Sequence, residues 1–359
     1  MALQFITGGA GSGKTRYLYE HAIRESLAHP DLTYLVVVPE QYTMQTQKEL
    51  IRLHPRRGLT NVDVLSFNRL ALRVFEDLSV ETLTVLDDMG KSMVLRKIAG
   101  ERRGSLRYYQ RHFGQMGFVN QLKSMISEMY QYGVTPEVLD ELRESSEDLV
   151  LKDKLQDLTM IYRGFQDYIR EKFTTAEEVL DLCCRMLPRW EKLSRSQVFL
   201  DGYTGFTPVQ YRIVELFITH ALDVVCAVTV DYGADPYRES GIQNLFYMSK
   251  HTVCRLAAMA KAGGVELKED VILDRRPAWR FAQSPALDFL EQNLYRYNGR
   301  VWKGEQDQVK LFCGQTPEEE VRYVKSRIGS LVREQGLRYR DMAVGTGDLV
   351  AASALRGFD

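Results

Sequence analysis

Near its start the chain carries the segment FITGGAGSGKTRY, whose residue types suit the binding of a polyphosphate. Gly8, Gly13, Lys14 and Thr15 meet the spacing G-x-x-x-x-G-K-[ST]. Such glycines let backbone N–H groups point at phosphate oxygens, the lysine reaches the β- and γ-phosphates, and the hydroxyl holds Mg²⁺. We therefore predict ATP as ligand, with binding residues Gly8, Gly9, Gly11, Ser12, Gly13, Lys14 and Thr15.

A nucleoside triphosphatase also needs an acid at the end of another strand, and commonly a neighbouring glutamate that activates water. The segment VFLDGY supplies Asp201, and we expect Thr15 and Asp201 to hold Mg²⁺ through ATP. A turn-forming aspartate before glycine is the structural alternative for Asp201. The next residue is Gly202, and the next acid, Glu215, falls well into the following helix. No residue is assigned as catalytic base, and we predict slow hydrolysis or none.

The pattern around these motifs predicts the elements that must position them. Residues 1–76 alternate short apolar runs with helical stretches, which is typical of β-α-β units in a parallel sheet. From about 82 to 190 the strand signals stop and long amphipathic helices follow, and strands return at 196–203 and 223–232. The sequence therefore predicts an α/β fold of the P-loop, RecA-like, superfamily-1 helicase-like type, with a large all-helical insertion.

The C-terminal third is less regular. Residues 233–305 show a mixed, polar pattern without clear elements. VKLFC at 309–313 reads as a strand, PEEEVRYVKSRIGSLVREQG as a charged helix, and DMAVGTG as the start of another strand. We expect a second α/β unit to begin here, and the chain to be the front piece of something longer.

Composition narrows the function classes. The 359 residues include 47 Lys and Arg against 48 Asp and Glu, for a net charge of -1, so any DNA contact must come from a local basic stripe. The five cysteines show no C-x-x-C spacing, and there is no signal peptide or long apolar run. We predict a cytoplasmic protein without membrane contact, in which Cys183 and Cys184 are small buried hydrophobes.

Beyond the glycine loop, four segments complete a family pattern: VVVPEQYTMQTQKEL, VDVLSFNRLALRVF, VFLDGYTGFTPVQYRIVELF and KLFCGQTPEEEVRYVKSRI. In this order they resemble the B subunit of the bacterial AddAB (RexAB) helicase-nuclease, over the whole chain. Members of that family are much longer and end in a nuclease domain with an iron-sulfur cluster, which would lie beyond Asp359. The resemblance implies a helicase-like domain 1A over 1–80 and 195–310, a helical insertion 1B over 81–194, and the truncated start of a domain 2A over 311–359.

The resemblance also implies a function in the repair of double-strand breaks by homologous recombination. The partner is the A subunit of a heterodimer, which is the motor that translocates along DNA. In that family, the helicase region of the B subunit is degenerate as a motor and scans single-stranded DNA for a recombination hotspot. The matching DNA-binding positions are Gln41, Thr43, Phe67 and Arg69, and Phe206 could add a stacking face.

These DNA positions have structural alternatives. Phe67 fits a core residue at a helix start, Arg69 fits a helix surface, and Gln41 and Thr43 fit an ordinary loop and helix cap. Leu72 departs from the aromatic residue that relatives carry there, so the hotspot sequence stays open. The basic and aromatic segment ERRGSLRYYQRHF is either a DNA groove or a solvated helix face.

Two other functions stay open on the sequence. One is an active DNA-stimulated ATPase or helicase, whose base comes from an unidentified residue or from the partner subunit. The other is a small-molecule P-loop kinase, for which the first residues alone would suffice. The helical insertion that splits the sheet favours the superfamily-1 type, because kinases of this kind are compact.

Overall fold

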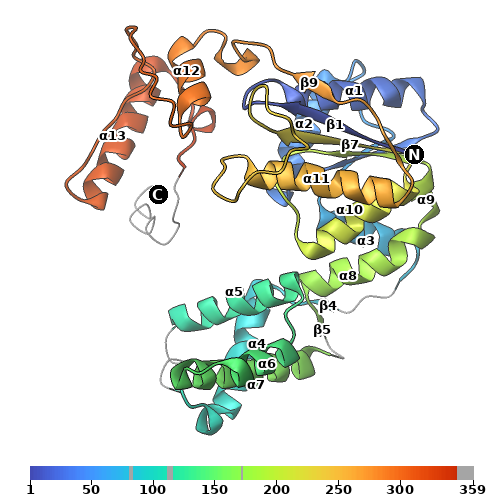
Figure 1. Ribbon diagram of the computed structural model, residues 1–359, viewed down its shortest axis with the longest axis vertical. Helices are drawn as coiled ribbons and strands as arrows, with labels where there is room; N and C mark the ends of the chain where they lie inside the picture. The colour runs from blue at the N-terminus through green and yellow to red at the C-terminus, as the bar shows by residue number, and fades with distance from the viewer. Residues whose placement is uncertain (81–83, 111–115, 171–172, 346–359) are drawn as a thin grey trace. The chain divides into compact units, whose positions relative to one another are not determined.

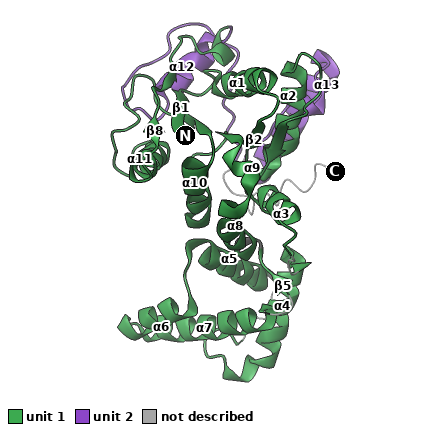
Figure 2. Ribbon diagram, turned by 90° about the vertical axis from the view of Figure 1, so that its right-hand side faces the viewer, with its two compact units in different colours: residues 1–282 green, residues 283–359 purple. Residues whose placement is uncertain are grey.

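The computed structural model describes residues 1–80, 84–110, 116–170 and 173–345. It divides into two compact units, residues 1–282 and the residues from 283 onward, which Figure 2 colours separately. No helix in the described ranges is both long enough and apolar enough to cross a membrane.

A parallel sheet of seven strands forms the centre of the first unit (Figure 1). Ala2 pairs with Asp223 and Thr33 pairs with Ser196, so two late strands separate the first two strands of the chain. Because the strands are parallel, the carboxyl ends of all of them meet at one edge. In spatial order the sheet contains β3 (Val62–Leu65), β2 (Thr33–Val37), β6 (Ser196–Leu200), β7 (Asp223–Thr229), β1 (Ala2–Gly8) and β8 (Glu266–Leu267), and β9 (Val271–Leu273) also pairs with β1.

Helices cover both faces of this sheet. On one face α1 (Lys14–Ala28) and α2 (Thr43–Leu53) share a core with strand residues such as Ile6 and Phe199. The core of the other face includes Phe5 and Leu200, and it is covered by α3 (Phe67–Asp77), α8 (Ala176–Met186), α10 (Pro208–His220) and α11 (Tyr247–Ala262). Strands buried on both sides explain the continuous apolar runs in the sequence. The short helix α9 (Glu191–Ser194) leads into β6.

Side-chain caps fix where two of these helices begin. The Oγ of Ser66 accepts a hydrogen bond from the backbone N–H of Arg69 and starts α3 directly after β3. Thr207 and Gln210 form a capping box at the start of α10, a few residues after β6. Such caps satisfy N–H groups that a helix leaves without partners. They set the short loops at the carboxyl edge of the sheet.

The helical insertion has a core of its own, formed by residues such as Leu95, Ile126 and Phe165. Figure 1 shows its helices gathered apart from the sheet: α4 (Asp88–Glu101), α5 (Met116–Tyr132), α6 (Pro136–Ser145) and α7 (Leu149–Ile169). Two short strands, β4 (Thr84–Val85) and β5 (Phe173–Thr174), pair where the chain leaves the sheet region and where it returns. α5 contacts α8 and α10 of the sheet region.

A buried carboxylate organises the basic and aromatic segment after α4. Asp157 on α7 accepts backbone hydrogen bonds from Arg107, Tyr108 and Tyr109. Tyr108 is partly exposed, with the Nζ of Lys154 4.6 Å from its ring centre. Residues 111–113 of this segment lie outside the described residues. The described residues of this segment, 101–110, therefore form a surface that a structural aspartate holds in place.

The second unit contains α12 (Pro285–Asn293) and α13 (Pro317–Gln335). The prediction of a strand at 309–313 is wrong, because these residues are irregular in the structure. Residues 342–345, in the segment DMAVGTG where another strand was expected to start, are irregular too. The reason lies in Phe312, whose ring stacks on Tyr323 of α13 with centroids 3.9 Å apart. Leu311 beside it is 99% exposed, so the run offers no buried face that a strand could use.

Candidate functional site

The glycine loop lies between β1 and α1, at the carboxyl edge of the sheet. Gly11 and Gly13 have φ values of 74° and 96°, which residues other than glycine rarely adopt. Gly13 is also the residue that precedes α1, and no side chain caps this helix. The N–H groups of the first turn therefore face the loop, where an anion is favoured.

Two polar side chains of the loop point to a ligand. The Nζ of Lys14 donates hydrogen bonds to the carbonyl oxygens of Gly8 at 3.0 Å and Gly9 at 2.7 Å, so it lies over the loop. The Oγ of Ser12 is buried and has no hydrogen-bond partner within the described part of the chain. A buried hydroxyl without a partner is costly, and a phosphate oxygen would satisfy it. The loop thus fits a polyphosphate.

Asp201 follows β6 and reaches the first residues of α1. Its Oδ1 accepts a hydrogen bond from the Oγ1 of Thr15 at 3.2 Å. Burial raises the pKa of the Asp201 carboxyl, while the hydrogen bonds from Thr15 and Tyr19 and the charge of Lys14 lower it. Mg²⁺ in nucleotide sites takes one or two carboxylates together with phosphate oxygens. Thr15 and Asp201 therefore fit this cation.

The turn after Asp201 disfavours a second acid. Gly202 has a φ of 80°, and a Cβ at this position would lie 3.2 Å from the Cδ of Pro39. A glutamate here would be strained by the backbone and crowded by the proline. Glu215, the next acid along the chain, is exposed in the second turn of α10. Within the described ranges, no group of three or more His, Cys, Asp or Glu side chains could hold a metal ion.

Sequence reasoning missed a segment that lies against the glycine loop. Residues 275–281, here called the strap, follow β9, which pairs with β1 as far as Gly8. The backbone N–H of Arg280 donates to the carbonyl oxygen of Gly11 at 3.2 Å, and a Cβ on Gly11 would lie 2.8 Å from the Cβ of Arg280. Trp279 is near Gly13 and is 62% exposed. The guanidinium of Arg275 stacks over its ring at 3.8 Å.

The strap therefore places a broad aromatic face and cations beside the loop. A signal for it was present in the sequence, because RRPAWRF combines three arginines with a tryptophan. The strand that positions the strap, β9, is only three residues long, so the sequence shows no periodic pattern from which the position of the strap could be predicted.

The positions expected to bind DNA follow three adjacent strands, β2, β3 and β6. Gln41 is exposed, whereas Thr43 is buried and its hydroxyl donates to the carbonyl oxygen of Glu40. Arg69 is exposed on α3, and its Nε donates to Glu40 at 3.0 Å. Ser66 also donates to Glu40. The Glu40 carboxylate thus ties the Arg69 guanidinium to the turn after β2.

The two phenylalanines meet in an aromatic cluster. Phe67 is 3% exposed, and its ring lies 5.5 Å from that of Tyr203 and 6.1 Å from that of Phe206. Phe206 is half-buried and also contacts Tyr211 at 5.4 Å. Phe67 therefore belongs to the core, as its structural alternative predicted. Leu72, exposed on the same face of α3 as Arg69, leaves a small apolar surface there.

The structure thus brings together Gly8 to Thr15 with Asp201, and Phe67 with Phe206. Gln41 is an exposed side chain in the turn before α2. The nucleotide and DNA positions lie at the same edge of the sheet, and their roles stay predictions.

Comparison with known proteins gives a consistent match. Residues 5–291 match the family described as ADDB, N-terminal. Proteins named as the B subunit of an ATP-dependent helicase/deoxyribonuclease are similar to this chain. That of Lachnoclostridium phytofermentans is 36% identical over 97% of this chain and 30% of its own length. Those of Acetivibrio thermocellus and Desulforudis audaxviator are 35% and 36% identical, over 97% and 96% of this chain and 30% of their own lengths.

The chain therefore spans about 30% of the length of these curated relatives. The match includes the glycine loop, Asp201, the strap and the helical insertion. On this similarity, the chain belongs to the AddB family, of which it represents an N-terminal part.

Proposed function

We propose that this chain binds ATP and Mg²⁺ at a P-loop formed by β1, the glycine loop and α1. It also binds single-stranded DNA at the carboxyl ends of β2, β3 and β6. In this proposal it is the helicase-like region of a helicase-nuclease subunit, which acts with an A subunit on the ends of double-stranded DNA in recombination repair. Residues 1–80 and 195–310 would form domain 1A, 81–194 domain 1B, and 311–359 the start of domain 2A.

The hydrogen bond between Thr15 and Asp201 carries the nucleotide part of the proposal. It joins the end of the glycine loop to the end of β6, as a shared Mg²⁺ site requires. Bound Mg²⁺ would neutralise phosphate charge, and the chain's own groups would orient the nucleotide. Lys14 and the N–H groups of the loop and of α1 would contact phosphate oxygens.

The same geometry supports a site that binds more than it hydrolyses. Hydrolysis of ATP needs a base or a water-positioning residue near the γ-phosphate. The turn at Gly202 favours glycine where the second acid would stand, and Glu215 is exposed on α10. We therefore propose a degenerate motor whose bound nucleotide is structural or regulatory, and whose DNA surface scans for a sequence.

The DNA part rests on the side chains gathered at this edge. Gln41 offers an exposed amide, Arg69 a cation, and Phe206 a half-buried ring. Since Arg69 is held by Glu40, a phosphate would have to compete with that carboxylate. This predicts modest affinity that depends on salt.

The experiment is to measure ATP binding and turnover by the purified chain, with and without single-stranded DNA. Lys14→Ala removes the loop cation, and Lys48→Ala, on the exposed surface of α2, is the matched control. We expect binding that is lost in Lys14→Ala and kept in Lys48→Ala, with no turnover stimulated by DNA. Robust turnover that rises with DNA would contradict the degenerate motor and favour an active ATPase. Phosphoryl transfer to a small molecule would favour the kinase.

A further inference from the structure

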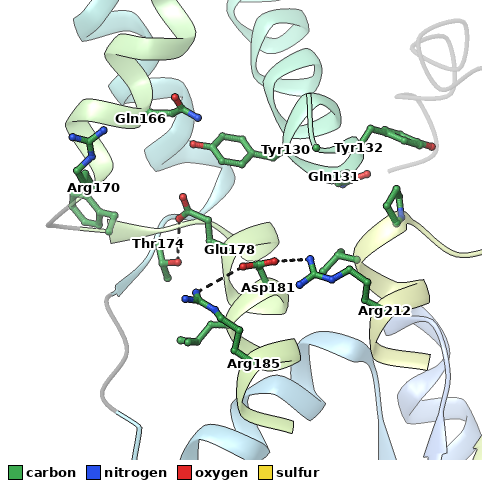
Figure 3. A pocket seen from close by; sticks show the side chains of 15 residues that line it. Tyr130, Gln131, Tyr132, Gln166, Arg170, Thr174, Glu178, Asp181, Arg185 and Arg212 are labelled. Carbon is green, nitrogen blue, oxygen red and sulfur yellow. Dashed lines mark hydrogen bonds and ion pairs between the residues drawn. The ribbon is translucent and has the colours of Figure 1, made fainter. Parts of the chain in front are cut away.

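A cavity of about 650 Å³ lies beside the helical insertion. Its walls come from the end of α5, from α7 and β5, and from α8 and α10. Figure 3 shows Tyr130 directed toward the side of Gln166 and Arg170, while Tyr132 points the other way. None of the positions assigned above to ATP or DNA lines this cavity.

Three arginines and two carboxylates line its walls. Asp181 is shared by two of the arginines, since it bonds the Nη1 of Arg212 at 2.7 Å and lies 3.8 Å from the Nη2 of Arg185. Glu178 is occupied by the capping box of α8, where it accepts from the backbone N–H of Thr175 at 3.0 Å. Arg170 contributes a third guanidinium from the opposite wall (Figure 3).

These guanidiniums reach into solvent. The side chains of Arg170, Arg185 and Arg212 are 73%, 64% and 54% exposed. Such surface ion pairs contribute little to stability, so a ligand can compete for their cations. Arginine is also the side chain best suited to the planar recognition of phosphate. Tyr132, exposed at the rim, adds an aromatic face.

The cavity adjoins the proposed DNA surface. A smaller cavity of about 260 Å³ is lined by Glu40, Ser66 and Phe67 at the ends of β2 and β3. Both cavities are lined by Gln131 and Val209, so they adjoin each other. An extended ligand that begins at Phe67 and Glu40 can therefore pass the end of α5 into the larger cavity.

We propose that the larger cavity binds the continuation of the single-stranded DNA that is held at the carboxyl ends of β2, β3 and β6. Arg170 and Arg185 contact phosphates, and Tyr132 stacks on a base. The alternation of cations with an aromatic face is the pattern that single-strand binders use. This proposal rests on the DNA part of the proposed function, which it extends by a second group of contacts on the helical insertion and α8.

The test measures the affinity of the purified chain for oligonucleotides of about 4 to 16 nucleotides, by fluorescence anisotropy at several salt concentrations. The variants are the double change Arg170→Ala and Arg185→Ala, and Tyr132→Ala. Arg212 is kept because of its bond to Asp181. Arg163→Ala is the matched control, because Arg163 lies on α7, is half-exposed and pairs with Asp140 away from the cavity.

We expect the double variant to bind short strands like the unchanged chain and long strands more weakly. Its salt slope for long strands should fall by about 0.7 for each phosphate that is no longer bound by an arginine. Tyr132→Ala should lower the affinity for long strands at least about fivefold, which is the effect of losing the stacking of one base. Arg163→Ala should match the unchanged chain at every length, and the double change to lysine should restore most of the salt slope.

Three results would overturn the proposal. If the double variant and Tyr132→Ala bind long strands as well as the unchanged chain does, the strand does not enter this cavity, and the proposed function stands. Equal weakening at every length would place even short strands in the cavity and would contradict the continuation. If the unchanged chain binds no single-stranded DNA, the DNA part of the proposed function fails, and the extension fails with it. Thermal melting of each variant shows whether it is folded.

Discussion

The hydroxyl of Thr15 donates a hydrogen bond to the carboxylate of Asp201 over 3.2 Å, although 186 residues separate them in the chain. The contact exists because β1 and β6 are both neighbours of β7 in one parallel sheet, so their carboxyl ends are close. A loop near the start of the chain and an acid beyond the helical insertion thereby form one site. Substitutions at this site and around it should have distinct effects.

Asp201→Asn should separate stability from function. Burial raises the pKa of Asp201 in the folded chain, so its ionised form is disfavoured there relative to the unfolded chain. Removing the charge should therefore raise the melting temperature of the chain without ligand at neutral pH. It should also weaken the Mg²⁺-dependent binding of ATP. Asp31→Asn, at an exposed loop position, should change neither quantity. A lower melting temperature for Asp201→Asn would contradict the assigned burial cost.

The binding of ATP with Mg²⁺ should depend on pH through the same carboxyl. Mg²⁺ needs the ionised form, and the raised pKa means that protonation begins at a higher pH than for an exposed aspartate. As pH falls, the gain in ATP affinity that Mg²⁺ provides should therefore decline before exposed carboxylates titrate. Titration calorimetry at several pH values, with and without Mg²⁺, measures this gain. In Asp201→Asn, the gain in ATP affinity from Mg²⁺ should be small and should not vary with pH. If this variant keeps the pH dependence of the unchanged chain, Asp201 does not bind the Mg²⁺.

Trp279→Ala should weaken nucleotide binding with little loss of stability. The ring is mostly exposed, next to Gly13, and stacked only by Arg275 among the contacts described for it. Exposed substitutions of this kind usually change the free energy of unfolding by about 0.5 kcal/mol or less. Fluorescent ATP analogues would report the affinity, and Trp279→Phe, which keeps an aromatic face, should retain most of it. Equal affinity of the alanine variant would show that the strap does not contact the nucleotide.

Phe67→Ala and Arg69→Ala should differ sharply in their effects on stability. Phe67 is buried among Tyr203 and Phe206, and the truncation of a buried phenylalanine costs about 3 to 5 kcal/mol. Arg69 is 57% exposed and its ion pair with Glu40 contributes at most about 1 kcal/mol. Urea unfolding measures the change in the free energy of unfolding for both variants. Affinity for single-stranded DNA that falls in Arg69→Ala, at unchanged stability, would support a direct contact.

The cysteines should react with thiol reagents in an order set by burial. Cys313 is exposed and Cys254 is partly exposed, whereas Cys183, Cys184 and Cys226 are buried. Burial raises the pKa of Cys183 to about 12, so its reactive thiolate is scarce at neutral pH. Mass spectrometry after brief labelling should find the reagent on Cys313 first, and on the buried three only after denaturation. Early labelling of Cys183 would show that α8 opens readily.

The sequence was sufficient for the elements with strong periodicity. Within residues 1–76, where the sequence predicts alternating strands and helices, 43–53 and 67–77 are helices and 62–65 is a strand. The α/β class with a parallel sheet is confirmed, and Cys183 and Cys184 are buried, as predicted. These features follow from local hydrophobic patterns, which report burial directly.

Other features depend on contacts that a local pattern does not contain. β8 and β9 are two and three residues long, and they form only because the edge of β1 offers them partners. The strand expected at 309–313 has the right apolar residues, yet Phe312 packs on Tyr323. The hydrogen bond from Arg280 to Gly11 likewise depends on where β9 pairs. Tertiary partners decide such cases.

The strand order also constrains how the molecule can assemble during synthesis. Ala2 pairs with Asp223, so the first strand made must wait for more than two hundred residues before its neighbour exists. The contacts of the helical insertion, by contrast, close over a shorter stretch, between β4 and β5. Local contacts form fast and distant strand pairs slowly, and chains fold progressively as they leave the ribosome. The ribosome-bound chain should therefore acquire a protease-resistant helical insertion first, and the glycine loop should take shape only after β7 has emerged.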